Sequence, residues 1–129
     1  MLITPIDKSK ETSGVEAEYY GVKLKIARAN NTNFKSLFRT LFAPYKYQME
    51  HNQSIPEEIS EDIMLKCYSQ TILVGWSGLK DVDGKEIHYS HEKAYELLKD
   101  DDDAYEFVKN QSNNMDAFIK KEEEDTKGK

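Results

Sequence analysis

The chain has 129 residues, of which 38% are apolar and 33% are charged, so it can bury one core beneath a strongly solvated exterior. No apolar run approaches the roughly 20 residues of a membrane span, and we expect no membrane partner. The single cysteine, Cys67, excludes an internal disulfide and a multi-cysteine zinc site, and we expect it to be a small core residue.

The net charge of −6 is divided unevenly along the chain. Residues 1–48 carry eight Lys or Arg and four Asp or Glu, whereas residues 49–129 carry ten and twenty. Opposite charges on the two halves are compatible with solvated faces of one domain. They also suit head-to-tail self-association, which makes a ring if its rotation closes and a filament if it does not.

The N-terminal part of the chain predicts an arm followed by a strand. Residues 1–14 hold few large apolar side chains, and we expect a flexible arm there. Residues 22–26 alternate apolar and lysine side chains, which indicates a strand with one solvated face. Because a single strand is unstable, it needs either residues 15–19 folded back as a hairpin or a neighbouring subunit. We therefore predict a strand or hairpin around residues 15–28, with a bulge or turn at Gly21.

A helix with one apolar stripe is predicted next. Its stripe has the spacing i, i+3, i+4, i+7 and i+8 and consists of Phe34, Leu37, Phe38, Leu41 and Phe42. Thr32 or Asn33 is expected to cap its first turn. We interpret the stripe as core, with a docking surface as the alternative. Pro44 should end or kink the helix.

Two further features organise the middle of the chain. Ser54 and Glu57 form a capping-box pattern that predicts a helix running to about Val74, where Gly75 stops it. The Asp83-Gly84 pair predicts a small hairpin around residues 79–89. Its pairing would place Val82, Ile87 and Tyr89 on one packed face, with Trp76 as the anchor.

The C-terminal part predicts two more helices. Ser90 is expected to cap the first of them. The four aspartates of residues 100–103 would favour the start of a last helix over residues 104–119. The tail, residues 120–129, has no apolar side chain and is expected to be disordered. The predicted fold is mainly α with a small β component (α+β), with four to five helices in a single globular domain of residues 15–119.

The sequence carries no convincing catalytic or metal pattern. The stretch "DVDGKE" resembles a calcium loop, but its glycine comes at position 4 and Lys85 occupies position 5, which destroys the central geometry. His88 and His91 lie near Asp81 and Asp83 without a third ligand at fixed spacing. No phosphate loop or nucleophile elbow is present. We expect no enzyme, no metal and no cofactor.

The candidate site residues are therefore ones that bind a partner. Tyr45, Tyr47 and Met49 follow Pro44, and tyrosine and methionine favour adaptable interfaces. An equally acceptable interpretation is that these three side chains cap the core. Lys35 and Arg39 take the polar face of the preceding helix. Basic residues interleaved with tyrosines also suggest nucleic acid, but the overall acidity argues against it, and we expect no nucleic-acid partner.

The order and spacing of several segments resemble a known family. These segments are "KIARANNTNFKSLFRTLFAPY", "ILVGWSGLKDVDGKEIHYSHEKAYELLKD" and "FVKNQSNNMDAF", which together span most of residues 20–119. The chain is similar to the tail assembly chaperones of long-tailed (siphophage-type) bacteriophages. Two positions depart from the family pattern: Lys93 stands in place of an asparagine, and Asp101 in place of a proline.

The resemblance implies a non-enzymatic function in phage tail morphogenesis. Such chaperones bind and solubilise the tape measure protein in the host cell cytoplasm, are displaced as the tail tube protein polymerises, and are absent from the mature virion. Many are also made in a longer form by a programmed ribosomal frameshift, for which Lys120 and Lys121 mark a candidate position. The alternative left open is a phage-encoded acidic adaptor or inhibitor that binds one host protein.

Overall fold

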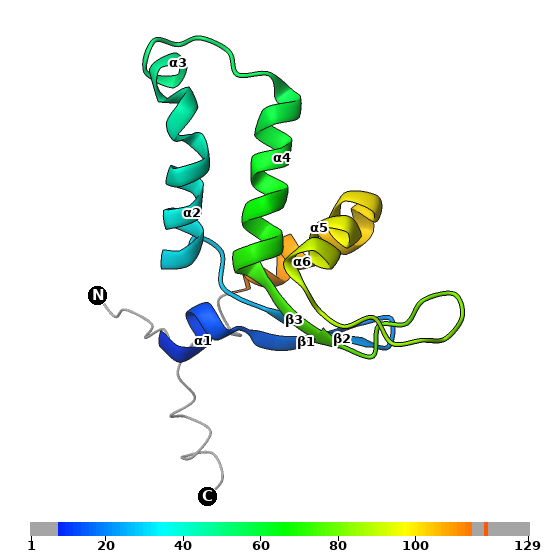
Figure 1. Cartoon of the computed structure of the whole chain (residues 1–129). Coiled ribbons are helices and arrows are strands. Elements are labelled where there is room, and N and C mark those ends of the chain that lie inside the picture. The colour runs from blue at the N-terminus through cyan, green and yellow to red at the C-terminus, as the bar shows by residue number, and fades with distance from the viewer. Residues whose placement is uncertain (1–7, 115–117, 119–129) are drawn as a thin grey trace, which may run out of the picture.

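The structure, a computed structural model, describes residues 8–114 and Phe118. The predicted tail, residues 120–129, lies outside the described residues, as do Met115 and Ile119 of the predicted last helix. Figure 1 shows a small sheet at the base and a pair of long helices that rise from it. The elements are α1 (Lys8–Ser13), β1 (Val15–Tyr19), β2 (Val22–Ile26), α2 (Thr32–Phe42), α3 (Lys46–Glu50), α4 (Glu57–Cys67), β3 (Leu73–Ser77), α5 (His91–Asp100) and α6 (Asp102–Ser112). This arrangement confirms the predicted α+β class.

The sheet is antiparallel in the order β1-β2-β3. β1 pairs with β2 from Val15 opposite Ile26 to Tyr19 opposite Val22, so the predicted hairpin at residues 15–28 is confirmed. Tyr20 and Gly21 have φ values of 48° and 82°, the two positive values that a tight two-residue turn requires. The alternation in β2 buries Leu24 and Ile26 and leaves its lysines exposed.

The third strand was not predicted. The helix predicted to run to about Val74 continues from α4 through a π-helical turn, Tyr68–Ile72, and the prediction is wrong only at its end, because β3 begins at Leu73. β3 pairs with the second edge of β2, where Leu24 lies opposite Trp76. Strand pairing gives hydrogen-bond partners to the backbone N–H and C=O groups of both strands. The free energy gained in this way outweighs the helical preference that the apolar spacing of this β-branched segment indicates.

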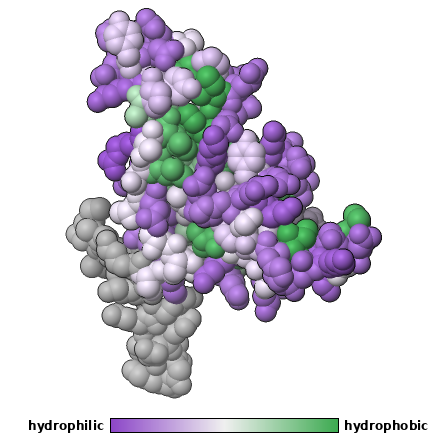
Figure 2. Space-filling view, viewed as in Figure 1, coloured by the Kyte–Doolittle hydropathy of each residue, from purple (hydrophilic) through white to green (hydrophobic). Residues whose placement is uncertain are grey.

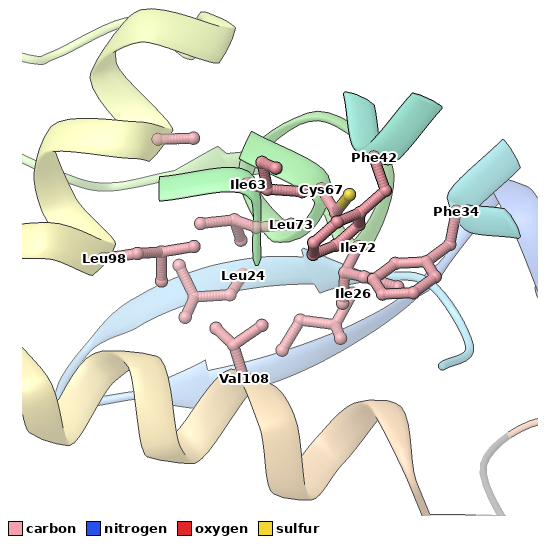
Figure 3. Close-up of a cluster of buried hydrophobic side chains, with 11 residues drawn as sticks. Leu24, Ile26, Phe34, Phe42, Ile63, Cys67, Ile72, Leu73, Leu98 and Val108 are labelled. Atoms are coloured by element: carbon pink, nitrogen blue, oxygen red, sulfur yellow. The ribbon is translucent and has the colours of Figure 1, made fainter. Parts of the chain in front are cut away.

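The core lies where the sheet, α4, α5 and α6 meet (Figure 3). Leu24 and Ile26 project from the sheet, Leu98 comes from α5, and Val108 comes from α6. Cys67 is fully buried in this cluster, which confirms its predicted place in the core. Burial raises the pKa of its thiol to about 11, so the thiol is neutral at physiological pH.

The α2–α4 arm, residues 32–67, consists of α2, α3 and α4 and extends away from the sheet (Figure 1). α2 packs against α4, and the polypeptide crosses between them at the far end through a 3-10 turn, Ala43–Tyr45, and α3. The predicted apolar stripe is only partly core. Phe34 and Phe42 are buried, whereas the other three side chains of the stripe are partly exposed, because one neighbouring helix cannot cover the whole stripe.

The helix starts confirm one predicted cap and correct two other predictions. Ser90 Oγ accepts the Lys93 N–H at 3.1 Å, as predicted. The predicted capping box at Ser54 does not form. α4 begins after Pro56, whose carbonyl accepts the N–H groups of Ile59 and Ser60, and no side chain caps this helix. α6 begins at Asp102, two residues earlier than expected, because the Asp101 carboxylate accepts the Ala104 N–H at 3.0 Å.

The loop of residues 79–89 reverses at Asp83-Gly84 as predicted, but its strand pairing is limited to an isolated bridge between Lys80 and Glu86. Asp81 Oδ1 accepts the backbone N–H groups of Asp83 and Lys85, each at 2.9 Å. Val82 is fully exposed, so its predicted place on a packed face is wrong. The carboxylate that resembled a calcium ligand therefore closes the turn.

The described part of the expected N-terminal arm is ordered into a helix. Residues 8–13 form α1, and the Arg28 N–H donates to the Glu11 carbonyl at 3.0 Å. The side chains of Glu11 and Arg28 also form an ion pair at 3.6 Å. These contacts correct the prediction of a loose arm for this part of residues 1–14.

Trp76 and Tyr89 attach the loop to the sheet. Trp76 Nε1 donates to the Ile87 carbonyl at 2.8 Å. The Trp76 and Tyr89 rings meet edge to face, with their centroids 5.0 Å apart. The single O–H of Tyr89 is shared between the carbonyl oxygens of Leu73, at 2.7 Å, and Ser69, at 3.0 Å from the hydroxyl oxygen. Tyr89 therefore supplies a donor at the π turn, where helical hydrogen bonding stops and strand pairing begins.

Tyr89→Phe should lower the free energy of unfolding by about 1 to 3 kcal/mol, because two part-buried carbonyls lose their hydroxyl donor. Urea denaturation followed by circular dichroism measures the change. Tyr20→Phe is the matched control, since Tyr20 is 91% exposed and should unfold like the wild type. Equal stability of both variants would contradict the role assigned to Tyr89.

The unfolding free energy should fall at alkaline pH. Burial raises the pKa of Tyr89 and Tyr105 to about 12 and that of Cys67 to about 11, from ordinary values of 10.0 and 9.0. Because the folded state favours the neutral forms, their contribution is complete below pH 9 and is lost as the pH rises toward 12. Urea denaturation between pH 8 and 11 should show the decline, with a smaller slope in Tyr89→Phe; constant stability over this range would contradict it.

Candidate partner-binding surface

The structure separates the five predicted site residues into two exposed pairs and one half-buried tyrosine. Lys35 and Arg39 are exposed on α2, one helical turn apart. Tyr47 and Met49 are 65% and 47% exposed on α3, at the tip of the α2–α4 arm. Tyr45 is half-buried and packs against the core cluster, which favours the core interpretation for this residue.

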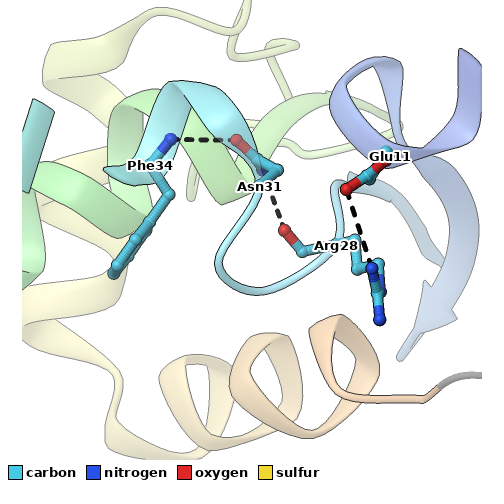
Figure 4. A network of polar contacts seen from close by, with 4 residues as sticks. All are labelled: Glu11, Arg28, Asn31 and Phe34. Carbon is cyan, nitrogen blue, oxygen red and sulfur yellow. Dashed lines mark hydrogen bonds and ion pairs between the residues drawn. The ribbon is translucent and has the colours of Figure 1, made fainter. Parts of the chain in front are cut away.

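Asn31 fixes the base of the α2–α4 arm (Figure 4). Its Oδ1 accepts the Phe34 N–H at 2.9 Å, and its Nδ2 donates to the carbonyls of Arg28 at 2.8 Å and Thr71 at 3.2 Å. The side chain is fully buried. Asn31 therefore caps α2, and the predicted caps are wrong because Thr32 and Asn33 lie inside the first helical turn with exposed side chains.

The backbone beside Asn31 is bonded to two other parts of the fold. The Ala27 N–H donates to the Ile72 carbonyl at 2.7 Å, and the Ala29 N–H donates to the Ser112 carbonyl at 2.8 Å. The segment between β2 and α2 is thus tied to the π turn and to the end of α6. These bonds set the direction in which α2 leaves the sheet.

An apolar slot lies on the exposed side of α2. It has a volume of about 270 Å³, and the rings of Phe34 and Phe38 lie 6.1 Å apart along it. A polar hollow of about 300 Å³ adjoins it and shares Asn30 and Lys35. The slot is lined by Asn30, Phe34, Lys35, Phe38 and Arg39, and the hollow by Glu11, Arg28, Ala29, Asn30, Lys35, Ser112 and Asn113.

A larger groove of about 700 Å³ lies between α4 and the α5–α6 pair. Met64, Leu65, Tyr68 and Tyr105 supply its apolar lining, and Lys99, Lys109, Glu61 and Asp102 supply its charges. Burial raises the pKa of Tyr105 to about 12 and that of Tyr68 above its usual value, so both rings carry neutral hydroxyls. The groove was not predicted from the sequence, because only the tertiary fold brings residues 60–68 and 98–109 together.

The space-filling view shows an apolar surface along α2 and α4, surrounded by polar side chains (Figure 2). It covers the side of the α2–α4 arm on which the stripe of α2 meets partly buried side chains of α4. An uncovered apolar surface with a charged border is typical of a protein interaction site. The surface is suited to adhesion to an apolar partner.

The histidines considered for a metal or acid–base site lie beside other side chains in the loop of residues 79–89 and at the start of α5. His88 lies 3.8 Å from Glu86 at the surface, and the His91 ring lies 6.1 Å from the Tyr89 ring. Among residues 8–114 and 118, no three or more His, Cys, Asp or Glu side chains are placed to hold a metal ion. In the same part of the chain, no helix has the length and apolarity needed to cross a membrane.

The fold and its surface define a small α+β protein with a partly uncovered apolar surface on its helical arm. The family model of the YdaY prophage protein matches residues 29–129, which is most of the chain. The chain therefore belongs to the YdaY prophage protein family and is a phage-derived protein. No curated protein and no solved structure matches it.

Asn31→Ala should lower the free energy of unfolding by about 2 to 3 kcal/mol, because α2 loses its cap and two carbonyls lose a buried donor. Urea denaturation followed by circular dichroism measures the loss. Asn33→Ala is the control, since the exposed Asn33 side chain caps nothing and its replacement should change stability by less than about 0.5 kcal/mol. The account of the arm's base is wrong if the two variants are equally stable.

Proposed function

We propose that this chain is a bacteriophage tail assembly chaperone that binds and solubilises the tape measure protein without catalysing a reaction. Two findings support the proposal. Segments spanning residues 20–119 resemble this chaperone family, and the chain belongs to a prophage protein family. The second finding supports a phage origin, and the chaperone function is our inference.

The observation that carries the proposal is the uncovered apolar surface of the α2–α4 arm (Figure 2). A tape measure protein is long, apolar and mostly helical, so its helices need an apolar surface to cover them before the tube forms. Amphipathic helices commonly bind such surfaces through side chains spaced at i, i+3, i+4 and i+7. Tyr47 and Met49 add two exposed side chains at the tip of the same arm.

Self-association would allow several copies to cover one client. The two halves of the chain have opposite net charge, and complementary patches guide encounter and orientation. Many weak contacts along one chain give avidity without a strong single site. In this proposal the copies are displaced by the tail tube protein in the host cell cytoplasm and are absent from the mature virion.

In a frameshifted longer form, the part read in the second frame would begin near residues 120–121. The two lysines there can be encoded by a run of adenines. The nucleotide sequence at this position tests the idea. A slippery run, with an overlapping reading frame downstream, supports a second product. The gene order provides an independent test, because a chaperone gene should lie between a tube protein gene and a very long reading frame.

Tyr47→Asp combined with Met49→Asp should move the tape measure protein from the soluble to the insoluble fraction on coexpression, because two exposed contact side chains become charged. The wild type should keep the same client soluble. The matched control is Tyr20→Asp combined with Val82→Asp, which changes two exposed apolar residues outside the α2–α4 arm. Circular dichroism should show that all three proteins are folded.

Two results would contradict the proposal. The client could remain insoluble with the wild-type protein, or it could stay equally soluble with both double variants. Tight binding of a single folded host protein by the monomer would instead support the acidic adaptor or inhibitor.

A further inference from the structure

One segment of the chain carries basic residues and no carboxylates. Between Tyr19 and Met49 there are six Lys or Arg and no Asp or Glu, in a protein with a net charge of −6. Three of these cations have acidic neighbours in the fold: Lys23 and Lys25 pair across the strands with Glu18 and Glu16, and Arg28 pairs with Glu11.

Lys35 and Arg39 differ from these three. Among the described residues, no carboxylate lies within ion-pair distance of either side chain. They are four residues apart on α2, so they lie roughly 6 Å apart along the helix axis. α2 itself contains no acidic residue. The helix therefore presents two cations, one turn apart, whose charge the fold does not neutralise.

The same two cations border the apolar slot. Phe34 and Phe38 line this slot together with Lys35 and Arg39. Its volume of about 270 Å³ is below the usual size of a small-molecule site, but it can receive one large apolar side chain. The neighbouring polar hollow shares Lys35 and Asn30 with the slot, so polar groups can be accommodated beside the inserted side chain.

We propose that the α2 slot recognises an amphipathic partner helix that carries two carboxylates one helical turn apart beside a large apolar residue. This inference rests on the proposed function, since the helix belongs to the tape measure protein. The apolar side chain enters the slot and packs on the Phe34 and Phe38 rings that line it, and the carboxylates meet Lys35 and Arg39. The apolar contact supplies affinity, and the charges set the register and increase the association rate.

The charge pattern favours an acidic helix over a nucleic acid. A nucleic acid backbone presents a continuous row of phosphates and needs a matching row of cations. Here three of the six cations have acidic neighbours, and the chain as a whole is acidic. Two isolated cations one turn apart match two carboxylates at i and i+4 on a facing helix.

The test uses the full chain and synthetic peptides of about 30 residues that tile the tape measure protein of the same prophage, a length at which helices can form. Lys35→Glu combined with Arg39→Glu should weaken binding of the acidic, amphipathic peptides by about tenfold or more at low ionic strength. Lys85→Glu combined with Lys93→Glu makes the same change in net charge at two other exposed positions. This control should bind like the wild type.

A compensating change gives the second readout. Peptides in which the two carboxylates are replaced by lysine should lose affinity for the wild type and regain it with the Lys35→Glu and Arg39→Glu variant. Fluorescence anisotropy measures both affinities, and circular dichroism checks that each variant is folded. Restored binding in the swapped pair supports a direct contact between these charges.

The outcomes separate the two proposals. If the wild type solubilises the tape measure protein and both charge variants bind its peptides equally well, the inference is wrong and the proposed function stands. If the wild type binds no peptide and keeps no client soluble, both fail. Binding of RNA or DNA that is lost only in the Lys35→Glu and Arg39→Glu variant would overturn the acidic helix in favour of a nucleic acid.

Discussion

The buried amide of Asn31 is the contact on which the rest of the structure depends. It joins the loop after β2 at Arg28 and the first turn of α2 at Phe34, which are neighbours in the sequence, to the π turn at Thr71, forty residues further along the chain. A buried amide has to satisfy both its donors and its acceptor, so it allows few relative positions of these segments. The α2–α4 arm therefore leaves the sheet in a defined direction.

The direction of the α2–α4 arm leaves part of an apolar surface uncovered. α2 has an apolar stripe wider than α4 alone can bury, and α5 and α6 pack beside the sheet instead. Phe34 and Phe42 contribute to the core, and the remainder of the stripe, with Lys35 and Arg39 beside it, faces outward. The same helix thus supplies part of the core and, in the proposed function, the surface that binds the client.

Local patterns in the sequence were sufficient to predict elements whose partners lie nearby. The alternation of β2 and the two-residue turn at Gly21 predict a hairpin, and Ser90 predicts a helix start, because each depends on neighbouring backbone groups. β3 could not be predicted in this way, since it forms only because β2 has a second edge to pair. The groove between α4 and α6 likewise depends on packing over long separations. Asn31 was missed because four consecutive polar residues, 30–33, all have side chains that can cap a helix, and the bond to the π turn at Thr71 distinguishes Asn31 from the others.

The central claim is that the exposed face of the α2–α4 arm adheres to an apolar helical client, and hydrogen–deuterium exchange with and without the tape measure protein tests it most directly. The account predicts slower amide exchange in residues 34–50 and 57–65 when the client is bound, with residues 79–89 unchanged. Protection confined to the loop of residues 79–89, or no protection on the arm, would contradict it.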